Sequence, residues 1–194
     1  MNILYMTLTI ESSMIQHEVR NTEMEDLPLI FELFDRSVLY QEKHGYPAWK
    51  NYDKDAIIND IRNKNQYKVL VGSKTAIVFS VRYNDELIWR ELEDGKAVYL
   101  HRIVVNPEFK GQKLFGAIVD WAIGHCREKG ATNLRMDTWA ANPNIISYYK
   151  GFGFKVVGNI TTPDTEELPV HNRRLALTLL EYRIPGSVPY EAHD

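Results

Sequence analysis

Two lysines and two glycines lie close together in residues 110–116, KGQKLFG, four residues after the apolar run of residues 103–105. This order predicts a buried strand, a short turn and then a helix over residues 111–129. The first N–H groups of a helix have no intrahelical partner, and they point along the axis at the positive end of the helix dipole. Together with the ammonium groups of Lys110 and Lys113, these N–H groups would bind an anion such as a phosphate.

Two adjacent tyrosines follow further along the chain, in NPNIISYYKGFGF at residues 142–154. This segment predicts a short helix over residues 143–150, capped by Asn142 and closed by glycines. Tyr148 and Tyr149 would be ~100° apart around that helix, so we expect them to point to different places. A phenol with a pKa of ~10 carries its proton at neutral pH and can therefore donate that proton or a hydrogen bond. The alternative for Tyr149 is an aromatic residue of the core.

These two segments, together with YLHRIVVNP at residues 99–107, resemble the GNAT superfamily of acyl-CoA-dependent N-acetyltransferases. The resemblance covers residues 98–154 well and the flanks in outline. Residues 110–115 lie where the family has an Arg/Gln-x-x-Gly-x-Gly/Ala pyrophosphate loop. Lys113 and Phe115 stand at the two glycine positions of that loop, where a Cβ could hold the backbone away from the pyrophosphate. We expect a helical backbone here, which does not require glycine.

The resemblance implies an enzyme that transfers an acetyl group from acetyl-CoA to a primary amine by direct attack in a ternary complex, without a metal. The acceptor is an unidentified small-molecule or peptide amine. Tyr149 would be the general acid, and His101 stands where family members carry the carboxylate of the base. The residues implied to bind acetyl-CoA are Ile103, Val104, Val105, Lys110, Gly111, Gln112, Lys113, Leu114, Phe115, Gly116, Asn142 and Tyr149. A non-catalytic acyl-CoA-binding or sensing module is the alternative, because the loop is altered and the base position lacks a glutamate.

His101 also has a structural alternative. Side-chain alternation along a strand places Tyr99, His101 and Ile103 on one face, and Leu100, Arg102 and Val104 on the other. An imidazole with a pKa of ~6.5 can accept a proton near neutral pH. A hydrogen-bonded histidine that only supports the strand is the other interpretation.

Three further residues near the expected cleft have two interpretations each. Asp137, in a predicted strand, either orients the acceptor or satisfies local backbone donors, and we expect the second role. Tyr46 and Trp49, between the first two predicted helices, either border the acceptor site or cover the core.

Composition excludes several other classes of protein. The chain has 194 residues and a net charge of −3 with mixed signs, which gives no basic face for a nucleic acid and no apolar run that spans a membrane. Its lone cysteine, Cys126, cannot form an internal disulfide and falls on the apolar stripe of a predicted helix, as a core residue would. No His/Cys spacing predicts zinc. We expect a cytoplasmic protein, and a homodimer is compatible with the sequence.

The elements that must position these residues predict an α+β fold with a mixed, mostly antiparallel sheet, flanked by helices and splayed at the cofactor site as in the GNAT fold. Residues 17–184 would form the single domain, between an extension (1–16, with Met14 as an alternative start) and a tail (185–194). Asn21 or Thr22 would cap the first helix, and Asp53 or Asp55 the second. The predicted strands cover residues 18–20, 67–71, 75–83, 97–105, 134–139, 154–160 and 175–182, the second to fourth of them as an antiparallel meander.

Overall fold

Seven strands form one sheet in the computed structural model, which describes residues 17–47 and 49–186. The expected extension, with Met14, and the tail from residue 187 lie outside this part of the chain. The sheet order is β1-β2-β3-β4-β5-β7-β6, and only β4 and β5 are parallel. The predicted meander is therefore confirmed. The strands are β1 (His17–Asn21), β2 (Gln66–Val71), β3 (Lys74–Arg82), β4 (Ala97–Val105), β5 (Asn133–Trp139), β6 (Lys155–Thr161) and β7 (Ala176–Arg183).

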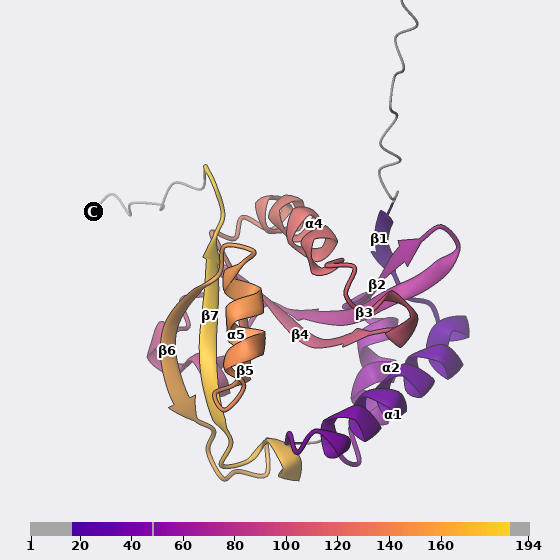
Figure 1. Cartoon of the computed structure of the whole chain (residues 1–194). Helices are drawn as coiled ribbons and strands as arrows, with labels where there is room; N and C mark the ends of the chain where they lie inside the picture. The colour runs from indigo at the N-terminus through magenta and orange to yellow at the C-terminus, as the bar shows by residue number, and fades with distance from the viewer. Residues whose placement is uncertain (1–16, 48, 187–194) are drawn as a thin grey trace, which may run out of the picture.

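Helices cover both faces of the sheet (Figure 1). Below strands β2 to β4 in this view lie α1 and α2, above them lies α4, and α5 runs along the β5–β7 half. The α-helices are α1 (Leu27–Lys43), α2 (Lys54–Arg62), α3 (Glu86–Trp89), α4 (Phe115–Glu128) and α5 (Pro143–Lys150). Short 3-10 turns are η1 (Met24–Asp26), η2 (Arg90–Leu92), η3 (Pro107–Phe109) and η4 (Val170–Asn172).

Each face of the sheet has its own apolar core. The α4 side buries Ile118 and Cys126 against Val98 and Leu100 of β4, whereas Val104 of the same strand belongs to the core under α1 and α2. Burial raises the pKa of the Cys126 thiol to about 12, so the side chain is inert at neutral pH. This confirms the prediction that Cys126 is a core residue.

The predicted cap of the second helix is confirmed, and that of the first is wrong. Asp53 accepts a hydrogen bond from the Ala56 N–H at 2.9 Å, which is an N-cap of α2. Thr22 instead donates its hydroxyl to the Gln66 carbonyl at 3.2 Å, and α1 begins only at Leu27, after η1. A tertiary contact to β2 thus removes the hydroxyl that the local pattern assigned to the helix.

Strands β4 and β5 pair over three residues only and then part. Ala97 to Tyr99 of β4 lie opposite Asn133 to Arg135 of β5, and beyond this point the two strands diverge (Figure 1). The divergence splits the sheet into a β1–β4 half and a β5–β7 half. This is the splay that the sequence predicted.

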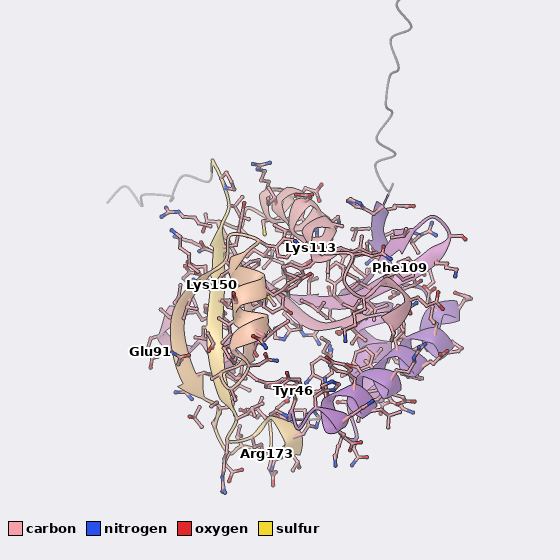
Figure 2. The ribbon with its side chains drawn as sticks, in the orientation of Figure 1. Tyr46, Glu91, Phe109, Lys113, Lys150 and Arg173 are labelled. Carbon is pink, nitrogen blue, oxygen red and sulfur yellow. The ribbon has the colours of Figure 1, made fainter. Side chains whose placement is uncertain are left out.

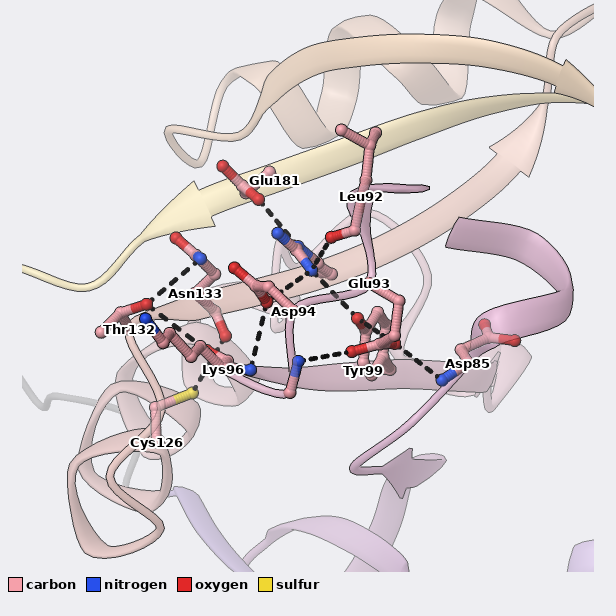
Figure 3. Close-up of polar contacts among 12 residues, drawn as sticks. Asp85, Leu92, Glu93, Asp94, Lys96, Tyr99, Cys126, Thr132, Asn133 and Glu181 are labelled. Carbon is pink, nitrogen blue, oxygen red and sulfur yellow. Dashed lines mark hydrogen bonds and ion pairs between the residues drawn. The ribbon is translucent and has the colours of Figure 1, made fainter. Parts of the chain in front are cut away.

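A buried polar network lies at the last paired position (Figure 3). Arg135 is 5% exposed and donates to Glu181 at 2.7 Å, to the Leu92 carbonyl at 2.8 Å and to the Tyr99 hydroxyl at 3.0 Å. Tyr99 in turn donates to Glu93 at 2.6 Å. Because every member has a partner, the network holds the two strands together where the parting begins.

A β-bulge in β4 reorients the side chains that follow His101. Val78 lies opposite Val104 and Ser80 opposite His101, so two residues of β4 oppose one residue of β3. Arg102 has a φ of +50°, and its guanidinium bonds to Asp60 of α2. The predicted alternation is therefore wrong beyond His101, because the extra residue shifts the period by one.

As a result of this bulge, Ile103 packs on the α4 side with Leu100, while Val104 faces α1 and α2.

Candidate active site

A cavity of about 440 Å³ lies between the two halves of the sheet. His101 of β4, Asp137 of β5 and Tyr149 of α5 all line it, although they are far apart in the sequence. Figure 2 shows Tyr46 in the space between α1 and the β7 half. The parting of β4 from β5 therefore brings the predicted base and the predicted acid to one site.

Asp85, His101 and Asp137 form a cluster on the wall of this cavity, in which the three nearest carboxylate or imidazole atoms lie within 4.8 Å of one another. His101 Nε2 is 3.3 Å from Asp85 Oδ2, a distance that permits an ion pair when the imidazole is protonated. Both atoms are buried, and neither makes a hydrogen bond to another described residue. The cluster is the one group of three metal-ligand residue types in the described part of the chain.

The carboxyl group of Asp137 lies near His101 and does not interact with its own backbone alone. Burial raises the pKa of its carboxyl group, the nearby His101 opposes this rise, and Asp85 adds to it. The expectation that Asp137 chiefly satisfies backbone donors is thus incomplete, because the fold places its carboxylate in the polar cluster. Asp85 was missed, since it lies in a polar linker whose sequence has no distinguishing pattern.

Tyr149 and Tyr148 point to different places, as predicted from the helix period. Tyr149 is 9% exposed and lines the cavity, with its ring 4.9 Å from that of Phe115. Tyr148 is 36% exposed and does not line the cavity. Burial raises the pKa of the Tyr149 phenol, and Tyr148 and Asp137 add to the rise, so Tyr149 keeps its proton at neutral pH. Tyr149 is therefore a packed aromatic residue that lines the cavity and carries a protonated hydroxyl group.

The predicted start of the anion-binding helix is wrong, because α4 begins at Phe115 and not at Gly111. Gly111 has a φ of +86° and Lys113 a φ of +55°, so the preceding loop twice enters the left-handed region. A lysine in that conformation is strained by roughly 1–2 kcal/mol relative to glycine. The expectation of a helical backbone at Lys113 is therefore wrong, and glycine would be favoured at this position.

Two residues predicted to contact the cofactor are already engaged within the protein. The Gly116 N–H donates to the Lys113 carbonyl at 3.2 Å. Phe115 is 3% exposed, and its ring packs into the core against Tyr149 and Phe152. Its side chain therefore extends away from the loop, which removes the expected obstruction at this glycine position.

The other predicted cofactor residues border the parted strands. Because β5 pairs with β4 only as far as Tyr99, the β5-facing edge of β4 at Ile103, Val104 and Val105 adjoins the gap. The ammonium of Lys110 lies 4.3 Å from the ring of Tyr40 in α1, a cation–π contact that joins the loop to that helix. Gln112 and Leu114 complete the loop between η3 and α4.

Asn142 has the capping role that the sequence predicted. Its side chain accepts a hydrogen bond from the Ile145 N–H at 3.2 Å at the start of α5. The residue also lines the cavity. Capping therefore places a polar side chain at the edge of the gap.

Aromatic side chains line another part of the cavity. The ring of Trp139, in β5, lies 5.8 Å from that of Tyr46 and 6.2 Å from that of Trp49. Trp49 also packs 6.0 Å from Phe34 of α1, so it covers the core and borders the cavity at once. We call Tyr46, Trp49 and Trp139 the aromatic wall; it connects the two halves of the sheet.

Comparison with known proteins decides the family. The model of the Acetyltransferase (GNAT) family matches residues 28–154. The chain belongs to the GNAT acetyltransferase family. This confirms the predicted family and its acetyltransferase activity, and the loop, the parted strands and the tyrosine-bearing helix described above all lie within the matched GNAT region.

Similar proteins support the GNAT assignment. A protein named uncharacterized N-acetyltransferase YesJ, from Bacillus subtilis strain 168, is 26% identical over 142 residues, which cover 69% of this chain and 79% of that protein. A GNAT structure from Streptococcus agalactiae superposes with a TM-score of 0.70 at 16% identity, covering 86% of this chain and 95% of that one. The structure of the ribosomal-protein-S18-alanine N-acetyltransferase from Escherichia coli superposes with a TM-score of 0.61 at 16% identity, covering 92% of this chain and 99% of that one. These structures confirm the predicted GNAT fold.

No helix within residues 17–47 and 49–186 is long and apolar enough to cross a membrane.

Proposed function

We propose that the chain transfers an acetyl group from acetyl-CoA to a primary amine by direct attack within a ternary complex. The observation that carries this proposal is the parting of β4 from β5 after Tyr99. It opens one cavity that His101 and Tyr149 both line, beside an edge of β4 that has no strand partner there.

The residues around the parted strands suit a CoA thioester, which would supply an activated acetyl group. Main-chain groups on the β5-facing edge of Ile103 to Val105 would hydrogen-bond the amides of the pantetheine arm, and one N–H would polarise the thioester carbonyl. Lys110 and Lys113 add positive charge beside the loop, where the pyrophosphate would bind. Asn142 lies at the edge of the same cavity and can bond the arm through its amide.

His101 and Tyr149 would handle the two protons of the reaction. His101 accepts a proton from the amine, directly or through a water molecule, so that the nitrogen lone pair can attack the carbonyl carbon. As the new C–N bond forms and the C–S bond breaks, Tyr149 donates its hydroxyl proton to the departing sulfur, and the nitrogen of the new amide loses its second proton to the resulting phenolate through water, which restores Tyr149. Because burial keeps the pKa of Tyr149 above its ordinary value, the phenol holds this proton until the thiolate appears.

The surroundings of the cavity favour a small acceptor. The aromatic wall joins the two halves of the sheet on one side, and the loop between β6 and β7 contributes Thr162, Leu168 and Asn172 to the lining. His171 of that loop lies beside the main chain of Lys50. A small amine fits such an enclosure better than a folded polypeptide does.

The proposed function also includes the bounds of the domain and a cytoplasmic location. Residues 17–184 would form one N-acetyltransferase domain, because a single sheet runs through all seven strands. A reduced, buried Cys126 suits the reducing cytoplasm.

The proposed reaction is tested by thiol release from acetyl-CoA over a panel of small primary amines, with mass spectrometry of the products and a parallel measurement of CoA binding. We expect thiol release that depends on one class of amine and yields the N-acetylated product. Binding of CoA without turnover on any amine of the panel would contradict the proposal and favour a binding module.

A further inference from the structure

The aromatic wall begins close to the polar cluster of the cavity. Asp137 lies beside His101, and Trp139 follows Asp137 by two residues on β5. Residues two apart on a strand point to the same face and lie ~7 Å apart along it. Both Asp137 and Trp139 line the cavity, so an acceptor with its nitrogen at His101 has the wall within reach of its other end.

The aromatic wall keeps apolar surface inside the cavity. Trp139 packs against Tyr46 and Trp49, yet all three side chains stay only half-buried. Leu175 is half-buried as well, packs on the same buried cluster as Trp139 and also lines the cavity. A ligand that covers these side chains removes apolar surface from water, which favours an apolar group at this place.

The cationic side chains of the cavity argue against an acceptor that carries a carboxylate. Arg102 is the one arginine or lysine among the described lining residues. Its guanidinium is bonded to Asp60 of α2 and, at 3.4 Å, to Ser80 of β3. An acceptor carboxylate would therefore lose its water without gaining a free cationic partner, which is costly.

The acidic side chains argue against a polyamine. Within the described lining, the carboxylates are those of Asp85 and Asp137, whose nearest atoms lie within 4.8 Å of each other and of His101. A second ammonium group at the aromatic wall would have only cation–π contacts in exchange for its hydration. The charges of the cavity are thus gathered at His101, and the wall suits an uncharged group.

We propose that the acceptor is a monoamine with an aromatic ring on a short linker, and that this ring packs on the aromatic wall while the nitrogen lies at His101. The inference rests on the proposed acetyl transfer and names the class of its acceptor. With bonds of ~1.5 Å, a two-carbon linker places the far side of a phenyl ring ~6 Å from the nitrogen, which matches the step from Asp137 to Trp139. Offset or edge-to-face contacts with Trp139 and Tyr46 add to the gain from apolar burial.

The test compares four amines that differ in the group at the other end of a short chain. They are 2-phenylethylamine, its saturated counterpart 2-cyclohexylethylamine, 1,4-diaminobutane and 4-aminobutanoate. Ligand-observed NMR at pH 7 gives their dissociation constants for the free protein and for the protein saturated with CoA, which cannot turn over. In at least one of these states we expect 2-phenylethylamine to bind ~3-fold or more tightly than the cyclohexyl amine, and ~10-fold or more tightly than the two amines with a charged tail.

Two variants of the aromatic wall locate the preference. Trp139→Leu and Tyr46→Leu each remove a ring but keep an apolar side chain, so each should remove most of the preference for the phenyl tail and leave cyclohexyl binding within ~3-fold of the wild type. Tyr83→Leu is the matched control, because Tyr83 is 38% exposed and does not line the cavity. Melting temperatures show which variants are folded. If Trp139→Leu is unfolded, Tyr46→Leu, in the segment after α1, decides the question.

The proposal is overturned if 2-phenylethylamine does not bind, if any of the other three amines binds as tightly in both states, or if every folded wall variant keeps the full preference. Failure of acetyl transfer is separable, because these measurements require no turnover. A protein that prefers the phenyl tail but acetylates no amine would contradict the proposed reaction and leave the aromatic site in place.

Discussion

The two halves of β4 differ in how their polar groups are satisfied. At Tyr99, the last residue paired with β5, the hydroxyl is enclosed by Glu93 and Arg135, and each donor has an acceptor. Two residues further on, His101 lines the cavity, and its buried Nε2 lies 3.3 Å from Asp85 Oδ2 without a hydrogen bond to a described residue. One strand therefore carries both a fully hydrogen-bonded network, at Tyr99, and a cavity-lining residue with an unsatisfied nitrogen, at His101. We expect mutations in the network to lower stability and mutations at the cavity to lower activity.

We expect the largest loss of stability from a mutation of Arg135, in the hydrogen-bonded network around Tyr99. Arg135→Met would leave Glu181, Asp94 and the Leu92 carbonyl without their buried partner. Because Glu181 and Asp94 are partly exposed, we expect a loss of about 3 kcal/mol, at the low end for broken buried pairs. Chemical denaturation measures it. Arg36→Met, at an exposed helical ion pair, is the control and should change stability by less than ~0.5 kcal/mol.

The largest effect on catalysis is expected at Tyr149. Tyr149→Phe keeps the ring that packs on Phe115 and removes only the hydroxyl, so kcat should fall ~10²-fold or more with little change in melting temperature. Tyr148→Phe is the matched control and should be mild, because that side chain does not line the cavity. A lost ordinary hydrogen bond of ~0.5–1.5 kcal/mol would slow turnover by about tenfold at most. Equal and small effects at both positions would leave substrate positioning as the main source of rate.

A smaller, pH-dependent effect is expected at His101. His101→Ala should lower kcat/KM by ~10-fold or more at pH values below the pKa of the acceptor amine, where a proton must still be removed. The loss should shrink as the pH rises towards that pKa, while the affinity for acetyl-CoA stays unchanged. A pH–rate profile in the variant that matches the wild-type profile would assign His101 a structural role.

The loop charges provide a test that concerns only the cofactor. Lys110→Glu combined with Lys113→Glu should weaken CoA binding ~10-fold at low ionic strength, with a smaller difference at high salt, because screening weakens the attraction between exposed charges. Titration calorimetry at two salt concentrations measures this. Unchanged affinity in the double variant would place the pyrophosphate elsewhere.

The smallest effect is expected from the strained loop position. Lys113→Gly relieves a φ of +55° and should raise the free energy of unfolding by about 0.5–1 kcal/mol, after allowing for the greater freedom of glycine in the unfolded chain. Gly111→Ala, at a φ of +86°, should change stability in the opposite direction. A destabilised Lys113→Gly variant would show that the lysine side chain, not its backbone, dominates at this position.

Patterns within a few residues predicted much of the fold and part of the site. The strand at residues 97–105 and the helix at 143–150 have the bounds expected from their patterns, and Asn142 caps that helix as expected. The different orientations of Tyr148, which is exposed, and Tyr149, which lines the cavity, follow from the helix period alone. These features depend on contacts between near neighbours in the chain, which composition and spacing report directly.

The sequence by itself determined the family, the order of the elements and the two candidate proton-transfer residues, because each is encoded in a short pattern. Tertiary structure alone decided the rest. The bulge at Arg102 depends on pairing with β3 and on Asp60 of α2, so strand alternation could not reveal it. Asp85 lies beside His101 and Asp137 because β4 and β5 part after Tyr99 and α3 packs next to the gap between them. Contacts between segments so far apart in the chain produce no periodic pattern in the sequence.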